Sequence, residues 1–301
     1  AADVTATPHS TKLAPGLALA VVGSIAFSGK AIIVKLAYRH GVDAVTLLMY
    51  RMLFALPFFA AMAWWAGRGK PALTRRDALG VLWLGFTGYY LASFLDFAGL
   101  QYITASLERL ILYLNPTLVL LLGWLMHGRR IRRPQAVAMA VSYSGVVLVF
   151  GHQLSLDGTA VAWGALLVFL STISYALYMS YSGELVHRLG ALRLAGLATS
   201  VACLLCIAQF ALLRPLAAAE VAPAVLWLSL LNATACTALP VLLVMMAIER
   251  IGPALTAQTG MIGPISTIAM GVLVLGEPFN LWVGAGTLLV LTGVWLLARA
   301  R

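Results

Sequence analysis

Five charged residues lie within long apolar stretches of the sequence: Lys30, Arg51, Asp96, Glu108 and Arg109. A charge at the centre of a bilayer-spanning helix costs about 2.5–3.5 kcal/mol on insertion scales, so such residues are candidates for function. A cluster of both signs can bind a zwitterion. Lys30 or Arg51 would then hold its carboxylate, and Asp96 or Glu108 its ammonium group. The alternative is structural, because the same charges can pair with one another or extend to the membrane interface.

Polar and aromatic side chains accompany these charges. Tyr89, Ser93 and Asp96 are spaced at i, i+4 and i+7, so they share one helical face. Because lipid offers no hydrogen bonds, such groups must face a partner helix or a wet cavity. Hydrogen bonds between helices are one role. The other is a central passage with aromatic walls, for which the candidate lining residues are Lys30, Arg51, Tyr89, Tyr90, Ser93, Asp96, Trp163, Tyr178, Asn232 and Gln258.

Motifs for other chemistry are incomplete. The stretch from Gly23 to Lys30 resembles a phosphate-binding loop, but five residues instead of four separate its glycines, and Ala31 follows the lysine. Cys203 and Cys206 form a Cys-x-x-Cys pair that has no second ligand pair. The five histidines fall in predicted loops or at helix ends. We therefore expect no catalytic residue, no metal site and no cofactor.

The composition indicates the elements that must position these residues. The chain has 301 residues, of which 62% are hydrophobic and 10% charged, and its mean hydropathy is +0.95. Soluble domains carry about 45–50% apolar and about 25% charged residues, so that class is excluded. A helix needs about 20 apolar residues to cross a bilayer. The sequence predicts an all-α polytopic membrane protein with ten spans, at residues 17–37, 44–66, 78–101, 105–126, 135–150, 159–181, 192–213, 222–246, 254–275 and 281–298.

The basic residues predict the orientation of these spans. Fourteen of the 20 Lys and Arg residues fall in the segments on the N-terminal side of the membrane, three on the other side and three within spans. Cytoplasmic loops keep the positive charge, so both termini are expected in the cytoplasm. The net charge of +10 therefore indicates orientation and not a nucleic-acid partner. The polar residues 1–12 lack a basic n-region, so no cleaved signal peptide is expected.

The sequence repeats itself at a shift of 148 residues. Pro116 then falls on Pro264, Gly128 on Gly276 and Gly145 on Gly293, without a gap. We expect a first five-helix repeat in residues 1–152 and a second in residues 153–301. Five is odd, so the second repeat would be inverted, as in secondary transporters. Pro116 and Pro264 are expected to bend the fourth and ninth spans, either as hinges or as static kinks.

The pattern of these repeats resembles the EamA family of the drug/metabolite transporter superfamily. The resemblance is carried by residues 50–55 (YRMLFA), 105–107 (ASL), 114–116 (LNP) and 121–123 (LLG), and by residues 262–264 (IGP), 274–277 (VLGE) and 293–294 (GV) in the second copy. Arg129 is a departure, since the family often has a Glu at this position, as Glu277 is in the second copy. The resemblance implies ten helices and export of small metabolites, often amino acids, with the aromatic amino acid exporter subgroup the most similar.

These observations predict a secondary transporter of a bacterial inner membrane. We expect it to move small amphipathic metabolites, chiefly amino acids including aromatic ones, by alternating access around a cavity between spans 1–4 and 6–9. Its expected partners are the substrate and the lipid bilayer, with no nucleic acid, and a monomer suffices. Asp96 is the candidate proton carrier. The alternatives are a nucleotide-sugar or drug exporter, an intramembrane lipid-modifying enzyme that uses Asp96, Glu108 and Arg109, and a channel or structural subunit.

Overall fold

The computed structural model describes residues 10–300, and within this range the chain is helical throughout, with short connections and no strand. The expectations for residues 1–9 and the charge of Arg301 lie outside the described part. Ten stretches are long and apolar enough to cross a membrane, which confirms the predicted architecture. They are Leu13–Tyr38, Ala44–Gly67, Arg75–Gly99, Ala105–His127, Arg133–Asp157, Thr159–Tyr181, Ala191–Leu213, Pro223–Gly252, Leu255–Leu275 and Leu281–Arg299, which we call spans 1 to 10.

Several spans are built from more than one helical element. In chain order the elements are α1 (Ser10–Tyr38), α2 (Ala44–Gly67), α3 (Arg75–Gly85), η1 (Phe86–Leu91), α4 (Ala92–Gly99), α5 (Ala105–Leu112), α6 (Asn115–His127), α7 (Arg133–Asp157), α8 (Thr159–Tyr181), α9 (Gly183–Leu189), α10 (Ala191–Leu213), η2 (Leu216–Ala219), α11 (Pro223–Ala233), η3 (Thr234–Ala238), α12 (Leu239–Thr259), α13 (Ile262–Met270), η4 (Gly271–Leu275) and α14 (Leu281–Arg299). Here η1, η3 and η4 are π-helical and η2 is a 3₁₀ turn.

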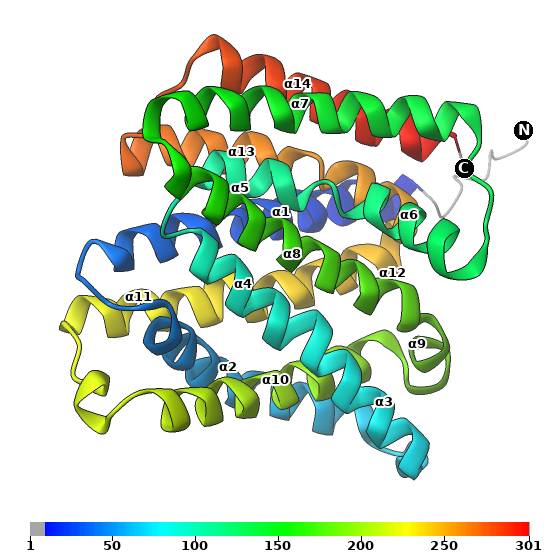
Figure 1. Ribbon diagram of the computed structural model, residues 1–301. Coiled ribbons are helices and arrows are strands. Elements are labelled where there is room, and N and C mark those ends of the chain that lie inside the picture. The colour runs from blue at the N-terminus through cyan, green and yellow to red at the C-terminus, as the bar shows by residue number, and fades with distance from the viewer. Residues whose placement is uncertain (1–9, 301) are drawn as a thin grey trace, which may run out of the picture.

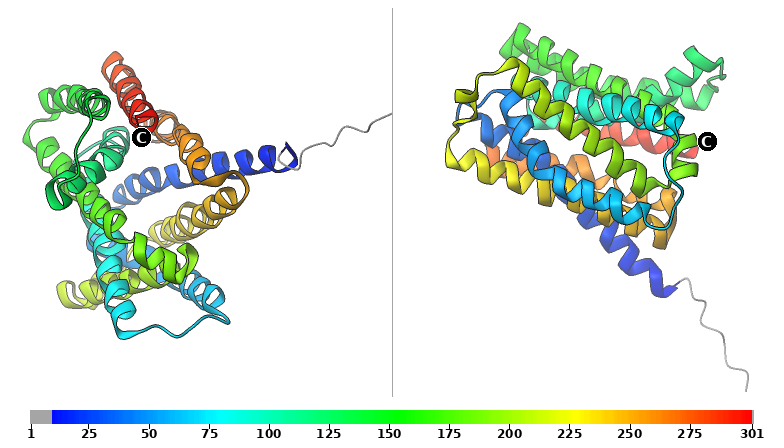
Figure 2. Two further views of the ribbon diagram at one scale, coloured as in Figure 1. Left: turned by 90° about the vertical axis from the view of Figure 1, so that its right-hand side faces the viewer. Right: turned by 90° about the horizontal axis from the view of Figure 1, so that it is seen from below.

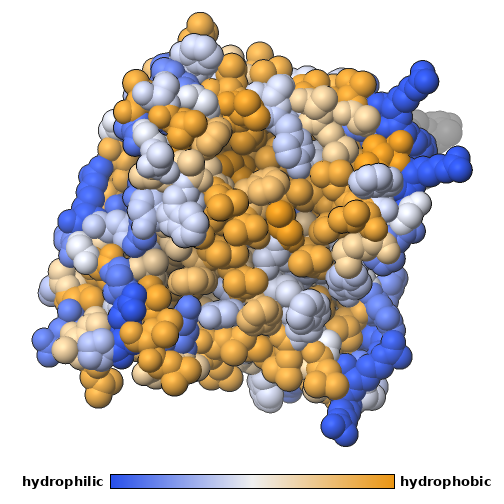
Figure 3. Space-filling model, in the orientation of Figure 1, coloured by the Kyte–Doolittle hydropathy of each residue, from blue (hydrophilic) through white to orange (hydrophobic). Residues whose placement is uncertain are grey.

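Both ends of the described chain lie at the same end of the helix bundle, which we call the terminal end (Figure 1). The space-filling view shows apolar residues across the middle of one face and hydrophilic residues gathered at the terminal and opposite ends (Figure 3). A band of apolar surface between two polar ends is what a bilayer requires. The fold is therefore that of an integral membrane protein.

The two halves repeat the same irregularities 148 residues apart. The π-helical segment η1 in span 3 begins at Phe86, and its counterpart η3 in span 8 begins at Thr234. Spans 4 and 9 end in a left-handed glycine, Gly128 with φ 64° and Gly276 with φ 70°. A glycine suits this position because a side chain at positive φ is strained. The shared glycines thus mark equivalent helix ends in two inverted five-span repeats.

Spans 4 and 9 are also interrupted at equivalent positions. The first break separates α5 from α6 at residues 113–114, and the second separates α12 from α13 at residues 260–261. Pro116 and Pro264 both lie in the first turn after the break, where a missing backbone N–H costs no helical hydrogen bond. The prolines therefore begin new helical segments, and flexing at these breaks stays a prediction.

Equivalent spans pack against each other across the repeat: α7 against α14 and α2 against α10, while α1 packs against α12. Seen from the terminal end, α7 and α14 stand at one edge of the molecule, away from α2, α3 and α10 (Figure 2). Backbones meet closely between α7 and α14, because a Cβ on Gly145 would lie 2.6 Å from the Gly286 carbonyl oxygen. Small residues at such crossings let membrane helices gain dispersion energy over a large contact.

Candidate substrate cavity

A cavity of about 350 Å³ lies between the two repeats in the interior of the bundle. The first repeat contributes residues of α1, α2, η1, α4, α5 and α6, and the second contributes residues of α8, α10, η3 and α12. All titratable charges on the wall come from the first repeat, while the second supplies hydroxyls. The polar lining residues are Lys30, Arg51, Tyr89, Ser93, Asp96, Arg109, Tyr113 and Asn115 from the first repeat and Ser171, Thr172, Tyr175, Thr199 and Thr237 from the second.

Lys30 is held between two carboxylates. Its Nζ lies 2.6 Å from Asp96 Oδ2 and 3.7 Å from Glu108 Oε1, which joins α1 to α4 and α5. All three side chains are buried, and Glu108 has 0% of its surface exposed. Desolvating three charges is offset only by close pairing, so this cluster fixes how the three helices meet. The ammonium group of Lys30 is consequently engaged.

Arg51 is a buried cation with a different environment. Its Nε and Nη2 donate to Thr237 Oγ1 over 3.2 and 3.0 Å, and its guanidinium lies 5.2 Å from the centre of the Phe97 ring. Among the described residues, no carboxylate oxygen lies within 4.0 Å of it. Neutral partners leave its charge uncompensated. Because it also lines the cavity, Arg51 can receive an anionic group from a solute.

Arg109 is a second cation on the cavity wall. Its Nε donates to Thr267 Oγ1 over 3.1 Å and its Nη2 to the Phe27 carbonyl oxygen over 3.2 Å. The guanidinium also lies 5.2 Å from the centre of the Phe27 ring. These contacts span three helices, so Arg109 holds α1 and α13 against α5 besides lining the cavity.

An acceptor lies opposite these cations. Asp96 binds Lys30 through Oδ2 only, and its other oxygen, Oδ1, is buried with no hydrogen-bond partner among the described residues. A buried polar atom without a partner costs about 1–3 kcal/mol, so it is a strong site for an incoming donor. The cavity wall therefore includes a cation without an acidic partner, Arg51, and a carboxylate with one oxygen that accepts no hydrogen bond, Asp96.

Aromatic rings form much of the remaining wall. Tyr89, Tyr175 and Phe59 line the cavity. Tyr178 lies behind them, with its hydroxyl 3.1 Å from that of Tyr89 and its ring 5.4 Å from Tyr175 in a stacked arrangement. Gly88 allows this close packing, because a Cβ there would lie 2.5 Å from the Tyr178 ring. The wall suits a flat, apolar group on a solute.

The π-helical segment η1 shapes this wall. A π turn leaves backbone carbonyls without their usual helical donors. Hydroxyls of α8 supply them, since Ser174 Oγ donates to the Thr87 carbonyl over 2.5 Å and Ser171 Oγ to that of Ala92 over 2.6 Å. These two serines of span 6 thus hold span 3 in place, and Tyr89 is presented to the cavity.

The structure brings together five of the ten candidate lining residues: Lys30, Arg51, Tyr89, Ser93 and Asp96. The other side chains lie elsewhere. Tyr178 supports Tyr89 from behind, and Tyr90 packs against Phe86 with ring centres 5.5 Å apart. Asn232 is buried on α11, and Gln258 is exposed on α12. Trp163 is 52% exposed, on a surface that faces lipid in a membrane.

Thr199 and Thr237 were not among the residues predicted from the sequence, although a signal for both exists. They stand 148 residues after Arg51 and Tyr89, and all four line the cavity. Phe27 and Tyr175 form a further pair of this kind. Applying the repeat to the predicted first-repeat residues would have identified their second-repeat partners.

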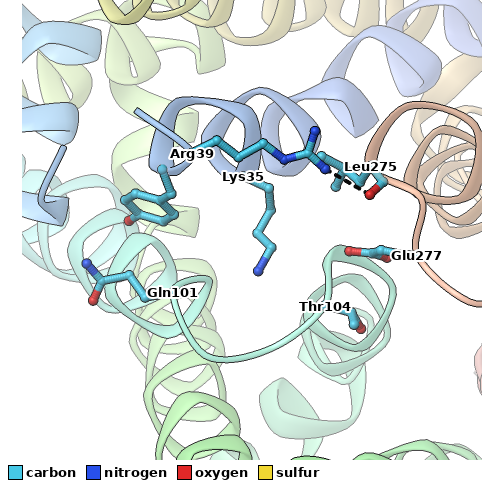
Figure 4. Close-up of a pocket in the computed structure, with 7 residues that line it drawn as sticks. Lys35, Arg39, Gln101, Thr104, Leu275 and Glu277 are labelled. Carbon is cyan, nitrogen blue, oxygen red and sulfur yellow. Dashed lines mark hydrogen bonds between the residues drawn. The ribbon is translucent and has the colours of Figure 1, made fainter. Parts of the chain in front are cut away.

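A second cavity, also of about 350 Å³, lies at the end of the bundle opposite the termini (Figure 4). Glu277, beyond the left-handed Gly276, closes one side of it by capping α5. Its Oε1 accepts from the Ala105 backbone N–H over 2.7 Å, and its Oε2 accepts from the Ser106 hydroxyl over 3.1 Å. A carboxylate at a helix N-terminus also meets the positive end of the helix dipole. This contact ties the second repeat to the first.

Lys35 of α1 and Arg39, which directly follows this helix, complete the connection at this end. Lys35 Nζ donates to the carbonyl oxygens of Leu100 and Ile103, each over 2.9 Å. Arg39 Nη2 donates to the Leu275 carbonyl over 2.8 Å, as the close-up shows (Figure 4). The ends of spans 1, 3, 4 and 9 are thereby held together at this end of the bundle.

The ten spans in two inverted repeats, with a polar cavity between them, define a membrane transporter architecture. Comparison with known proteins agrees. The sequence profile of the EamA-like transporter family matches residues 14–151 and again residues 162–299. The chain belongs to this family.

Curated relatives and a solved structure extend the comparison. The chain is 30% identical to the "Uncharacterized transporter YcbK" of Bacillus subtilis (strain 168), with 93% of each chain covered. It is 26% identical to the "Uncharacterized transporter YetK" of the same organism, over 93% of this chain and 84% of the relative. A solved structure described as "Crystal structure of protein" matches with a TM-score of 0.62 and 17% identity, over 95% of this chain and 98% of that one, and shows the shared fold.

Proposed function

We propose that the protein is a secondary transporter that exports small zwitterionic metabolites, amino acids including aromatic ones, across a bacterial inner membrane. The observation that carries this proposal is the pairing of chemistries in one cavity: Arg51 has no acidic partner within 4.0 Å among the described residues, and Asp96 Oδ1 has no donor. A zwitterion supplies an anionic group for Arg51 and an ammonium donor for Asp96 Oδ1. The excess of basic residues in the terminal-end loops supports a cytoplasmic location of both termini.

The structure favours one assignment among those that the sequence leaves open. Lys30 already pairs with Asp96 at 2.6 Å, so the substrate carboxylate binds Arg51. Glu108 is fully buried, whereas Asp96 lines the cavity, so the substrate ammonium group binds Asp96. Charge-assisted hydrogen bonds of this kind contribute about 1.5–3 kcal/mol each. The Tyr89 and Tyr175 rings then contact the side chain of the substrate.

Alternating access follows from the position of the cavity between the repeats. The contacts of Glu277, Lys35 and Arg39 close the end opposite the termini in this state. To open that end, α5 must leave Glu277, and the break at residues 113–114 lets α5 move relative to α6. The equivalent break at residues 260–261 serves span 9 at the other end, as the inverted repeat requires.

One observation favours a second candidate substrate. Arg51 and Arg109 both line the cavity and neither has a carboxylate oxygen within 4.0 Å among the described residues. Two guanidinium groups without acidic partners suit a phosphate-bearing solute such as a nucleotide sugar. The cluster of Asp96, Glu108 and Arg109, in contrast, lies inside the bundle and is at most 4% exposed. A lipid-modifying enzyme would need these groups at a membrane interface, so we propose no catalytic role for them.

Counterflow in proteoliposomes tests the proposal. Vesicles are preloaded with one unlabelled amino acid, and uptake of the same labelled amino acid is followed for a panel that includes phenylalanine and tryptophan. We expect transient uptake that depends on the internal amino acid, is lost in Arg51→Gln and persists in Arg250→Gln, a change of an exposed arginine. Exchange of a nucleotide sugar and of no amino acid would support the second candidate and refute the first.

A further inference from the structure

Glu108 is a buried acidic residue to which the proposed function gives no role. It is 0% exposed, and neither Oε1 nor Oε2 has a hydrogen-bond donor among the described residues. It does not line the cavity, so a substrate does not reach it. A carboxylate with two unsatisfied oxygens in a dry interior is expensive unless it is paired or neutral. The groups around Glu108 must therefore either pair with its negative charge or favour its neutral form.

The pairing available to Glu108 is insufficient. Lys30 Nζ is 3.7 Å from Glu108 Oε1 but only 2.6 Å from Asp96 Oδ2, so the ammonium group is committed to Asp96. Arg109, the next residue, directs its guanidinium N–H groups to Thr267 and Phe27. Two carboxylates thus compete for one ammonium group, and like charges so close together cannot both be ionised without a large cost.

A proton on Glu108 resolves both problems. Asp96 and Glu108 both lie beside Lys30 Nζ, at 2.6 Å and 3.7 Å, so Asp96 is the neighbouring carboxylate that would accept a hydrogen bond from a protonated Glu108. That bond would give Asp96 Oδ1, which lacks a partner, a donor, and would give Glu108 an acceptor. The elements packed against α5 are α1, α7, α8, α13 and α14. From these elements and from α4, the charged groups that act on Glu108 are Asp96, Lys30 and Arg109.

The same oxygen of Asp96 is the one that receives the substrate. We propose that Glu108 holds an exchangeable proton, that this proton leaves when a substrate ammonium group binds Asp96, and that the protein therefore exchanges protons for substrate in opposite directions. This inference rests on the proposed function. It also moves the proton from Asp96, the candidate in the sequence, to Glu108.

The step balances in charge and atoms. Before substrate enters, Glu108 is a neutral carboxylic acid, Asp96 is a carboxylate and Lys30 is an ammonium group. As the substrate enters, the O–H bond of Glu108 breaks and its proton passes through Asp96, which lines the cavity, to a water molecule there, which becomes H₃O⁺; the substrate ammonium group then takes the freed Asp96 Oδ1. Lys30, 3.7 Å from Glu108 Oε1, then compensates the new carboxylate. One positive group enters the cluster as one proton leaves it.

A pH gradient across proteoliposomes tests this exchange. With an acidic lumen, wild type should accumulate the labelled amino acid above its level at equal pH, and a trapped pH-sensitive dye should report proton efflux. Glu108→Gln should lose this accumulation, measured relative to its own exchange at equal pH. Glu184→Gln, which alters a side chain 67% exposed, should retain it. Exchange in wild type that ignores the gradient would overturn the proton inference and leave the proposed function standing.

An infrared measurement decides the same point without a substrate. A protonated buried carboxylic acid has a carbonyl stretch that an ionised carboxylate lacks. We expect this band in purified wild type at neutral pH, its loss in Glu108→Gln, and its persistence in Glu184→Gln. If wild type and Glu108→Gln gave the same spectrum in this region, Glu108 would carry no proton and the inference would fail, even if no amino acid of the panel were transported.

Discussion

Lys30 on α1 and Asp96 on α4 form an ion pair of 2.6 Å in the interior of the bundle, with Glu108 at 3.7 Å from the same ammonium group. The pair decides which charges are left for a substrate. With Lys30 engaged, Arg51 is the cation that a carboxylate can reach, and the second oxygen of Asp96 is the acceptor for an ammonium group. Lys30 therefore holds the helices together, while Arg51 and the second oxygen of Asp96 remain to bind the substrate.

Removing Lys30 should destabilise the protein. Lys30→Met leaves the buried Asp96 carboxylate without its ammonium partner, and breaking a buried pair costs about 3–5 kcal/mol. Adding Asp96→Asn to this variant should recover part of the loss, because it removes the carboxylate that was left unpaired. Thermal unfolding in detergent, followed by circular dichroism, measures both effects. A single variant as stable as wild type would show that the cluster does not hold α1 against α4 and α5.

The crossing of α7 and α14 should depend on Gly145. A Cβ at this position would lie 2.6 Å from the Gly286 carbonyl oxygen, so Gly145→Ala should cost about 1–3 kcal/mol through overpacking. Gly151 is the matched control on the same helix, since a Cβ there meets no atom within 4 Å. Gly151→Ala should instead stabilise, because alanine favours a helix. Equal midpoints of thermal unfolding for the two variants would contradict the packing argument.

The start of α2 should confer a pH dependence on stability. Asp43 caps this helix, accepting from the Thr46 N–H over 3.2 Å and from Arg214 Nε over 3.1 Å. Partial burial raises the pKa of Asp43, but the hydrogen bonds from Thr46 and Arg214 outweigh it and hold that pKa below its usual value. The stability that this shift contributes is fully present above about pH 3.9, the unfolded value, and is lost as pH falls through the lower folded pKa.

Asp43→Ala should therefore lower stability by about 1 kcal/mol at neutral pH and flatten its decline in acid. Asp157→Ala, a change of an exposed residue at the end of α7, is the control and should do neither. Unfolding midpoints measured across a series of acidic and neutral buffers test this. A variant that keeps the acid decline of wild type would show that other groups cause it.

How much of this the sequence predicts depends on the range of each interaction. Ten spans follow from local hydropathy, but two helices extend beyond the apolar runs. Span 5 was predicted at residues 135–150 and continues to Asp157, and span 8 was predicted at 222–246 and continues to Gly252. Each ends beside a glycine with positive φ, Gly158 at 75° and Gly252 at 82°. These helices end where a glycine changes the backbone conformation, and the hydropathy of the sequence carries no information about that change.

Pairing within the site was not predictable in the same way. The sequence identifies Lys30, Arg51 and Asp96 as buried charges but not which cation Asp96 binds, because that depends on how α1, α2 and α4 are rotated about their axes. The direction of the Trp163 side chain was not predictable either. Its face of α8 is exposed, and an aromatic residue in an apolar span is as favourable toward lipid as toward the interior. Local pattern therefore leaves the direction of a side chain open.

The end opposite the termini should open more readily when Glu277 loses its charge. Glu277→Gln keeps an acceptor for the Ala105 N–H but replaces a charged bond with a neutral one about half as strong. A loss of about 1 kcal/mol corresponds to about fivefold faster exchange of the α5 amides. Hydrogen–deuterium exchange of the peptide over residues 103–110 measures it, with the exposed Glu220→Gln as control. Unchanged exchange would mean that Glu277 does not hold this end closed.

The central claim is that a zwitterion is held between Arg51 and Asp96, and competition for phenylalanine counterflow tests it most directly. Phenethylamine lacks the carboxylate and 3-phenylpropionate lacks the ammonium group, so in wild type each should compete about tenfold to a hundredfold more weakly than phenylalanine. Arg51→Gln has no counterflow to compete with, so its binding is measured by calorimetry on the purified variant, where phenethylamine should bind as well as phenylalanine. Wild type that binds all three equally, or an Arg51→Gln variant that still discriminates against phenethylamine, would contradict the account.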